Sequence, residues 1–150
     1  MEVFRISSEL HSRTLTSSGR ANRWNKLGQN VIYTGSSRSL VTLESIVHKN
    51  SIKTSAIYKV LVISIPDDEI FVKQILLSDL PENWRTLSAY STLQDIGSTW
   101  YEGNETLLLK VPSAIIPFEY IYIINTEHQD FPDNIRLVRI EDYFYDDRLL

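Results

Sequence analysis

The chain has 150 residues, of which 43% are hydrophobic and 23% are charged, a balance that lets one domain bury a core of its own. It contains no cysteine, which excludes disulfides, a thiolate nucleophile and a cysteine-based zinc site. The net charge of -4 argues against direct nucleic-acid binding, because affinity for a polyanion depends mainly on lysine and arginine.

The start of the sequence has neither a basic segment nor an apolar leader, and no apolar run approaches the roughly 20 residues of a membrane-spanning helix. We therefore expect a cytoplasmic protein without membrane contact. His11, His48 and His128 lack the spacing of metal ligands, so no metal site is expected.

Two short strands are expected in the first part of the chain, over residues 2–7 and 31–34, with a long loop between them. The loop is rich in Ser, Thr, Gly and Asn, and a connection of this length is uncommon unless it has a task such as ligand binding. It also holds a local concentration of basic residues, namely Arg13, Arg20, Arg23 and Lys26. This cluster suits one small phosphate ligand.

Helices and strands alternate irregularly along the rest of the chain. Residues 38–49 have helical spacing behind a turn at 35–37. Residues 57–65 form a β-rich run that ends at Pro66, and the alternation over 69–77 predicts its partner strand. A second helix is expected over 88–100, and further strands over 106–111, 119–125 and 135–144. The pattern predicts one α+β domain over residues 1–150, with a curved, mixed or largely antiparallel sheet.

Glu44 stands out in the first helix because it falls within an otherwise apolar arc. The arc consists of Leu40, Val41, Leu43, Ile46 and Val47. Thr42 and Ser45 fall on the opposite, solvated face. A carboxylate that faces the core is costly unless it is paired or hydrogen-bonded. Glu44 is therefore either a site residue or the partner of a nearby arginine in a structural ion pair.

Arg23 and Tyr33 are candidate ligand-binding residues in and just after the long loop. A guanidinium can bind phosphate through two parallel hydrogen bonds, and Trp24 lies beside Arg23. The alternative is a surface arginine next to a tryptophan that anchors the loop. Tyr33 is either a core residue or a ring that stacks on a flat ligand.

Ser113 lies between Pro112 and Pro117 in an apolar segment whose backbone is restricted by the prolines. The segment is not a Gly-x-Ser-x-Gly elbow, and no His–acid pair is evident by spacing. A serine that orients a ligand by a hydrogen bond fits this setting better than a nucleophile.

Taken in chain order, these segments resemble the RES domain, a family named for its Arg, Glu and Ser. The resemblance extends over nearly the whole chain and rests on the following blocks: Phe4-Arg5-Ile6, Arg23-Trp24-Asn25 with Gly28, Val31-Ile32-Tyr33, Leu43-Glu44, Val47-His48, Val111-Pro112-Ser113, Asn125, His128 and Asp147-Arg148-Leu149. It implies a fold similar to ADP-ribosyltransferases. It also implies the toxin of a bacterial toxin–antitoxin pair, which degrades NAD by cleaving the nicotinamide N-glycosidic bond.

The resemblance assigns a role to each candidate residue. Arg23 would bind the NAD phosphates beside Tyr33 as a stacking wall. Glu44 would be the catalytic carboxylate, and Ser113 would position the ribose or the nicotinamide. Arg5 would line the pocket, with a structural pairing as the alternative. NAD is then the substrate, inorganic phosphate is the co-substrate if the reaction is phosphorolysis rather than hydrolysis, and no cofactor is needed.

The resemblance also implies two macromolecular partners. One is an Xre-type helix-turn-helix antitoxin, and the other is a second copy of the chain, with the apolar run 116–124 as one source of a homodimer interface. Two other functions stay open: an ADP-ribosyltransferase that modifies a macromolecule, and a non-enzymatic nucleotide-binding or DNA-binding accessory module. Product analysis after incubation with NAD separates these functions.

Overall fold

The computed structural model of the protein describes residues 1–48 and 56–150. Its strands are β1 (Glu2–Ser8), β2 (Val31–Gly35), β3 (Tyr58–Ser64), β4 (Val72–Gln74), β5 (Leu108–Pro112), β6 (Tyr120–Asn125) and β7 (Arg136–Tyr143). Its α-helices are α1 (Arg38–Val47), α2 (Tyr90–Gly103) and α3 (Phe131–Asn134). The predicted helix over 38–49 is therefore confirmed up to residue 47, while Lys49 lies outside the described residues.

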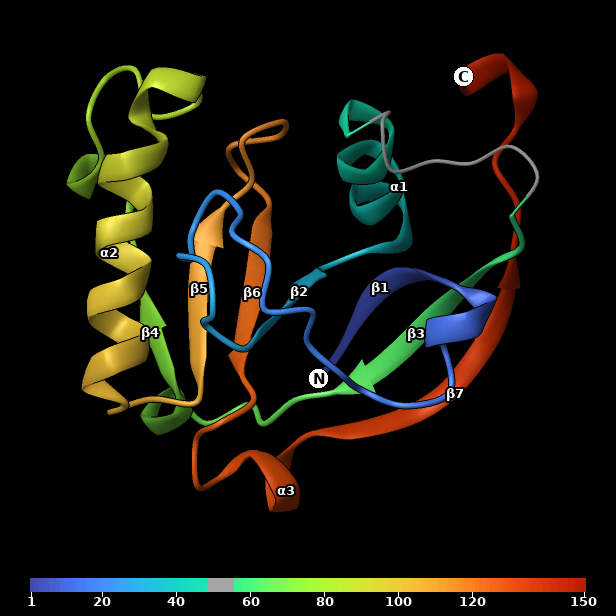
Figure 1. The fold of residues 1–150 in the computed structure, drawn as a ribbon, viewed down its shortest axis with the longest axis horizontal. Coiled ribbons are helices and arrows are strands. Elements are labelled where there is room, and N and C mark those ends of the chain that lie inside the picture. Colours follow the sequence, from blue (N-terminus) through green and yellow to red (C-terminus); the bar gives the residue numbers. More distant parts are fainter. Residues whose placement is uncertain (49–55) are drawn as a thin grey trace.

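These strands form one seven-stranded sheet over the described residues, in the order β4-β5-β6-β2-β1-β3-β7. The pair β4–β5 is parallel and the other pairs are antiparallel. In Figure 1, β5 and β6 stand beside α2, whereas β3 and β7 run diagonally across the other half of the molecule. The expected α+β class with a mixed, curved sheet is confirmed.

The core lies on both faces of the sheet because the interior strand β6 is apolar from Tyr120 to Ile124. Ile121 and Ile123 pack with Leu93 and Trp100 of α2 on one face. The alternate residues of β6 pack with Val3 and Leu61 on the other face. A continuous apolar run is typical of a strand that is covered on both sides.

This burial narrows one expectation about the homodimer to the residues before β6, where Phe118 is 85% exposed. The run 116–124 was a candidate source of dimer interface, but residues 121–124 are buried inside the monomer. β6 also has β5 and β2 as its neighbours, so neither its faces nor its edges are free to bind a second copy. The apolar character of these residues serves the core.

The predicted pairing of residues 57–65 with residues 69–77 is wrong. Residues 69–71 form a short 3-10 turn, which is capped by the Asp68 carboxylate through the amide of Ile70 at 3.0 Å. Only β4 follows this turn as a strand, and it pairs with β5 at the far edge of the sheet. Both edges of β3 are already occupied by β1 and β7. Alternation of apolar and polar residues predicts a strand but not the strand with which it pairs. Here the pairing is set by contacts between residues distant in sequence.

Helix α2 starts and ends close to its predicted bounds. A 3-10 turn at Leu87–Ala89 leads into the helix. Its end is set by Asn104, which adopts the left-handed conformation at φ 52° and donates its amide to the carbonyl of Trp100. Among the helices of the described chain we find no candidate for a membrane span.

Candidate active site

A partial split in the sheet creates the site. In the described chain, β1 and β2 are in register at one position, Phe4 with Gly35. By contrast, β1 pairs with β3 over seven positions, from Glu2 with Ser64 to Ser8 with Tyr58. Beyond Phe4 the guanidinium of Arg5 reaches across to β2 and donates to the carbonyl of Tyr33 at 3.3 Å. The two halves of the sheet therefore part at this point, and side chains fill part of the opening.

A cavity of about 480 Å³ lies at this split. Its walls come from β1, β2, the loop before β2, the inner side of α1 and the segment after β5. Four of the predicted site residues share this wall: Arg5, Arg23, Tyr33 and Glu44. The loop and helix that the sequence singled out are therefore brought together in space.

Glu44 reaches the cavity because of where α1 lies. The helix is capped by Ser37, whose side chain accepts a hydrogen bond from the amide of Leu40 at 3.1 Å. Its first turns pack on β1 and β2 and bury Leu40 and Val41. Glu44, together with Ser45 and His48, lines the cavity.

The predicted apolar arc of α1 is only partly a core-facing surface. Leu43 is 38% exposed and Val47 is 63% exposed, although both lie on the arc. Thr42 and Ser45, which were assigned to the solvated face, are half-buried, and the Thr42 hydroxyl lies 2.8 Å from that of Tyr143. The periodicity correctly predicted a helix with one apolar face toward the protein interior. In the second half of α1, however, this face borders the cavity and not a packed core.

Ser113 holds the Glu44 carboxylate. Its hydroxyl donates to Glu44 Oε1 at 2.7 Å and accepts from the amides of Ile115 and Ile116, each at 3.1 Å. A serine hydroxyl has one proton and two acceptor positions, so two incoming amides direct that proton to Glu44. The side chain is completely buried and does not line the cavity itself. The structure thus places Ser113 behind Glu44, and the expected contact of Ser113 with a ligand stays a prediction.

No arginine neutralises Glu44 in the residues that the structure describes. The ion pairs found there join other groups. Within the described part of the chain, the alternative of a structural ion pair between Glu44 and a nearby arginine therefore finds no support, and the carboxylate is held by a neutral donor instead.

Arg23 is fixed by contacts with the segment before α2 and with the first residue of that helix. Its Nη1 donates to the carbonyls of Trp84 and Arg85, at 3.3 Å and 3.2 Å. Its guanidinium carbon lies 4.8 Å from the centre of the Tyr90 ring. The guanidinium has five N–H donors, so donors remain for a ligand in the cavity.

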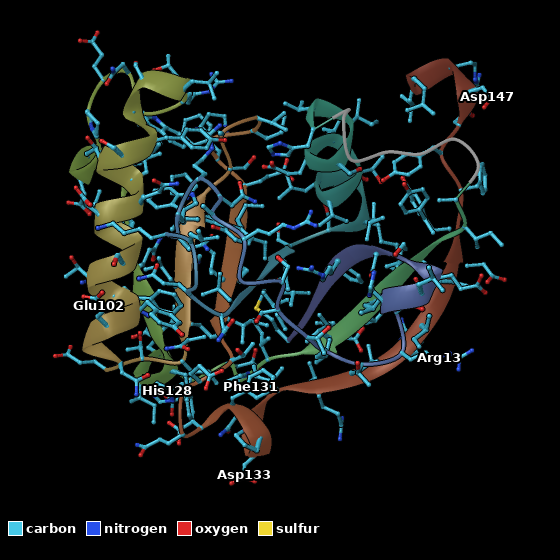
Figure 2. All side chains as sticks on the ribbon, in the orientation of Figure 1. Arg13, Glu102, His128, Phe131, Asp133 and Asp147 are labelled. Carbon is cyan, nitrogen blue, oxygen red and sulfur yellow. The ribbon has the colours of Figure 1, made fainter. Side chains whose placement is uncertain are left out.

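The other basic residues of the loop, Arg13, Arg20 and Lys26, do not line the cavity. Lys26 pairs with Asp95 of α2 at 2.8 Å. Figure 2 shows Arg13 at the periphery, with its side chain pointing away from the molecule. The prediction that these four residues together bind one phosphate is therefore wrong. They are spread along an extended loop, and of the four, Arg23 lines the cavity.

Arg5 adds a second positive charge to the cavity. Burial lowers the pKa of its guanidinium, because removal from water disfavours the charged form. No carboxylate forms an ion pair with it in the part of the chain that the structure describes. A second, small cavity of about 30 Å³ touches Arg5 from the side of His11 and Thr14. An anionic ligand would supply the counter-charge that Arg5 lacks.

Several site features carried no usable sequence signal. Asn22, Ser45 and His48 line the cavity, and the carbonyls of Trp84 and Arg85 orient Arg23. Carbonyl groups occur at every position, so no residue pattern marks them. Within the described residues we find no group of three or more His, Cys, Asp or Glu side chains that could hold a metal ion.

His128 belongs to the far end of the molecule. Figure 2 shows it near Phe131 and α3, away from α1. It is buried, and its Nδ1 accepts from the amide of Asp130 at 3.1 Å. This residue therefore closes a turn, whereas Arg5, Arg23 and Glu44 form the cavity wall.

Comparison with known proteins identifies the family to which this fold and cavity belong. The RES domain matches residues 2–146. The chain therefore belongs to the RES domain family, as its residue blocks predicted. Toxin Res of Yersinia enterocolitica serotype O:8 / biotype 1B is 36% identical over 127 residues, which cover 85% of this chain and 82% of that protein.

Two further comparisons extend this result. The Prs ADP-ribosylating toxin of a Sphingobium species is 33% identical over 129 residues, which cover 85% of this chain and 80% of that protein. Among solved structures, a chain of the MbcT–MbcA toxin–antitoxin complex of M. tuberculosis superposes with a TM-score of 0.77 at 18% identity, covering 95% of this chain and 83% of that chain. At this identity the structural match supports the fold alone.

Proposed function

We propose that the protein is the toxin of a toxin–antitoxin system and that it degrades NAD by cleaving the nicotinamide N-glycosidic bond. The observation that carries the proposal is the Glu44 carboxylate, which Ser113 holds on the wall of a cavity that also contains Arg23 and Arg5. The names of the relatives support the toxin role. The two arginines suit a ligand that carries phosphates.

The charges in the cavity match the demands of this reaction. When the bond between ribose C1′ and the nicotinamide nitrogen breaks, the electron pair leaves with nicotinamide and positive charge develops on the ribose. A fixed carboxylate stabilises that charge without reorganisation. Arg23, with Arg5, would hold the diphosphate so that the reacting ribose lies near Glu44.

The acceptor then forms a new bond to C1′ and releases one proton. Water gives ADP-ribose, whereas hydrogen phosphate gives ADP-ribose 1″-phosphate. Incubation of the purified protein with NAD, with and without phosphate, followed by mass analysis, distinguishes the two reactions. Recovery of intact NAD under both conditions would contradict the proposal and favour a non-enzymatic nucleotide-binding module.

Transfer of ADP-ribose to a macromolecule is the second candidate function. It is favoured by the printed name of the Sphingobium relative, an ADP-ribosylating toxin. The same bond breaks, and a side chain or nucleic-acid group takes the place of water or phosphate. Cell lysate incubated with NAD labelled in the adenine would then contain labelled macromolecules, and free ADP-ribose would be a minor product.

We also propose an Xre-type helix-turn-helix antitoxin as the partner that suppresses this activity, because an unrestrained NAD-degrading enzyme would stop the growth of its own cell. Production of the chain alone should lower cellular NAD and arrest growth, and co-production of the neighbouring antitoxin should restore both. Arrested cells with unchanged NAD would contradict the proposed activity. A homodimer is a further proposal, which light scattering at micromolar concentrations tests.

A further inference from the structure

The hydroxyl of Tyr33 connects β2 to the loop that carries Arg23. It donates to Asn25 Oδ1 at 2.6 Å and accepts from the amide of Trp24 at 3.1 Å. Burial raises the pKa of the Tyr33 phenol above its ordinary value, so the group stays protonated and keeps its donor proton at neutral pH. Two consecutive residues directly after Arg23 are therefore held by one side chain.

Asn25, which the Tyr33 hydroxyl holds, is itself hydrogen-bonded to both ends of the turn. Its side chain is 2% exposed, and its amide nitrogen donates to the carbonyls of Arg20 at 2.8 Å and Lys26 at 3.1 Å. Trp24 is buried in the core beside α2, so the turn is also anchored by packing. Residues 20–26 thus form a closed turn, with Arg23 at the side of the cavity.

We propose that Tyr33 is a positioning residue, whose hydroxyl holds the turn of residues 20–26 so that Arg23 lies in the wall of the cavity. Its contribution to ligand binding then passes through Arg23, and not through stacking of the Tyr33 ring on the ligand. The identity of the ligand as NAD rests on the proposed function. The hydrogen bonds that carry the inference are independent of it.

The variant Tyr33→Phe separates the two roles because it removes the hydroxyl and keeps the ring on the cavity wall. The substitution removes both hydrogen bonds of the hydroxyl. We expect the dissociation constant for NAD to rise on the order of tenfold, because the turn that carries Arg23 is held less firmly, with kcat within about twofold of the wild type. Tyr120→Phe is the matched control, since Tyr120 lies on another strand and does not line the cavity. The control should bind NAD as the wild type does.

A double-mutant cycle with Arg23→Ala tests whether the effect passes through Arg23. In the Arg23→Ala background, Tyr33→Phe should cause no further loss of NAD affinity. Unchanged affinity in Tyr33→Phe alone, or losses that multiply in the double variant, would overturn the inference and favour a direct role of the ring or an independent effect.

Hydrogen exchange provides a readout that needs neither NAD nor activity. The Trp24 amide should exchange slowly in the wild type and faster in Tyr33→Phe by at least an order of magnitude, while amides of β6 keep their protection. If the wild type neither binds nor consumes NAD, the proposed function fails. The exchange result still tests whether the Tyr33 hydroxyl holds the turn of residues 20–26. Equal exchange of the Trp24 amide in both proteins would overturn it.

Discussion

At the scale of single residues, the most informative contact is the hydrogen bond from Ser113 to Glu44. The Ser113 hydroxyl accepts hydrogen bonds from two backbone amides, so its own proton is donated to the carboxylate. Ser113 thus fixes both the orientation and the hydrogen bonding of Glu44 from behind. This role needs no contact between Ser113 and a ligand.

Ser113→Ala should lower kcat by about tenfold and leave the NAD dissociation constant nearly unchanged, because the serine orients the carboxylate and does not line the cavity. The two amides of Ile115 and Ile116 lose their acceptor, which should also destabilise the fold by about 1–3 kcal/mol. Steady-state kinetics, NAD titration and thermal unfolding measure these effects. A variant with weakened NAD binding and normal kcat would instead indicate that Ser113 binds the substrate.

The sequence predicted the members of this site better than their contacts. Arg5, Arg23, Tyr33 and Glu44 do share one cavity. Their roles toward a ligand remain predictions. The contact between Ser113 and Glu44 joins residues 69 positions apart, and no local pattern predicts such a pair. The spread of Arg13 away from Arg23 depended on the path of an irregular loop, which hydrophobic periodicity does not describe.

At the scale of elements, α2 is the support of the loop that carries Arg23. Gln94 donates to the carbonyl of Asn22 at 2.9 Å, and Ser98 accepts from Gln29 at 2.7 Å. Gly97 lies between them at a very close approach. A Cβ added at Gly97 would lie 1.6 Å from the carbonyl oxygen of Trp24. Helix and loop therefore depend on the absence of a side chain there.

Gly97→Ala should displace the loop from α2, because backbone on both sides leaves no room for a methyl group. We expect a loss of about 1–3 kcal/mol in unfolding free energy and a weaker affinity for NAD. Gly103→Ala is the control, since a Cβ there meets nothing within 4 Å, and alanine should stabilise the helix by up to about 1 kcal/mol. Equal NAD affinity and stability in the two variants would rule out the tight contact.

The ion pair between Arg38 of α1 and Glu141 of β7 should make stability depend on acid pH. Arg38 donates to both carboxylate oxygens of Glu141, each at 2.8 Å. These hydrogen bonds, with a further contribution from Arg139, lower the pKa of Glu141 to about 2. Because this pKa is lower in the folded state than in the unfolded state, the contribution is complete above about pH 4.5 and is lost as the pH falls toward 2.

Glu141→Gln should therefore lower the melting temperature at pH 7, and the difference from the wild type should disappear near pH 2. The effect at pH 7 should stay at about 1 kcal/mol or less, since water screens a pair near the surface. Glu105→Gln, at an exposed glutamate, is the control and should behave as the wild type does at each pH. A difference that persists at pH 2 would show that the glutamate contributes by packing.

Some elements could be located from the sequence and others could not, and the strength of their apolar pattern explains the difference. β6 and α2 have strong apolar patterns and were located within a few residues. β4 is three residues long, and it pairs with β5 rather than with the strand before it. Strand order and the split between β1 and β2 depend on pairings that are distant in sequence, and these leave no local signal.

At the scale of the whole molecule, the split sheet explains how a small chain forms a cavity of about 480 Å³. A fully paired sheet would place β1 against β2 and fill this space with backbone. The opening exposes Arg5 and Tyr33 on two strand edges, and α1 and the long loop complete the wall. Most residues that line the cavity thus come from the first half of the chain. Pro112, Ala114 and Ile121 complete the wall, and the segment directly after β5 supplies Ser113.

The central claim is that Glu44 stabilises the positive charge that develops on the ribose during cleavage of NAD. Glu44→Gln keeps the shape and the contact with Ser113 but removes the negative charge. The decisive measurement is NAD turnover by the folded variant, together with NAD affinity and thermal unfolding. We predict normal binding, a nearly unchanged melting temperature and a fall in turnover of about two orders of magnitude or more. A folded Glu44→Gln protein with near-normal turnover would contradict the account.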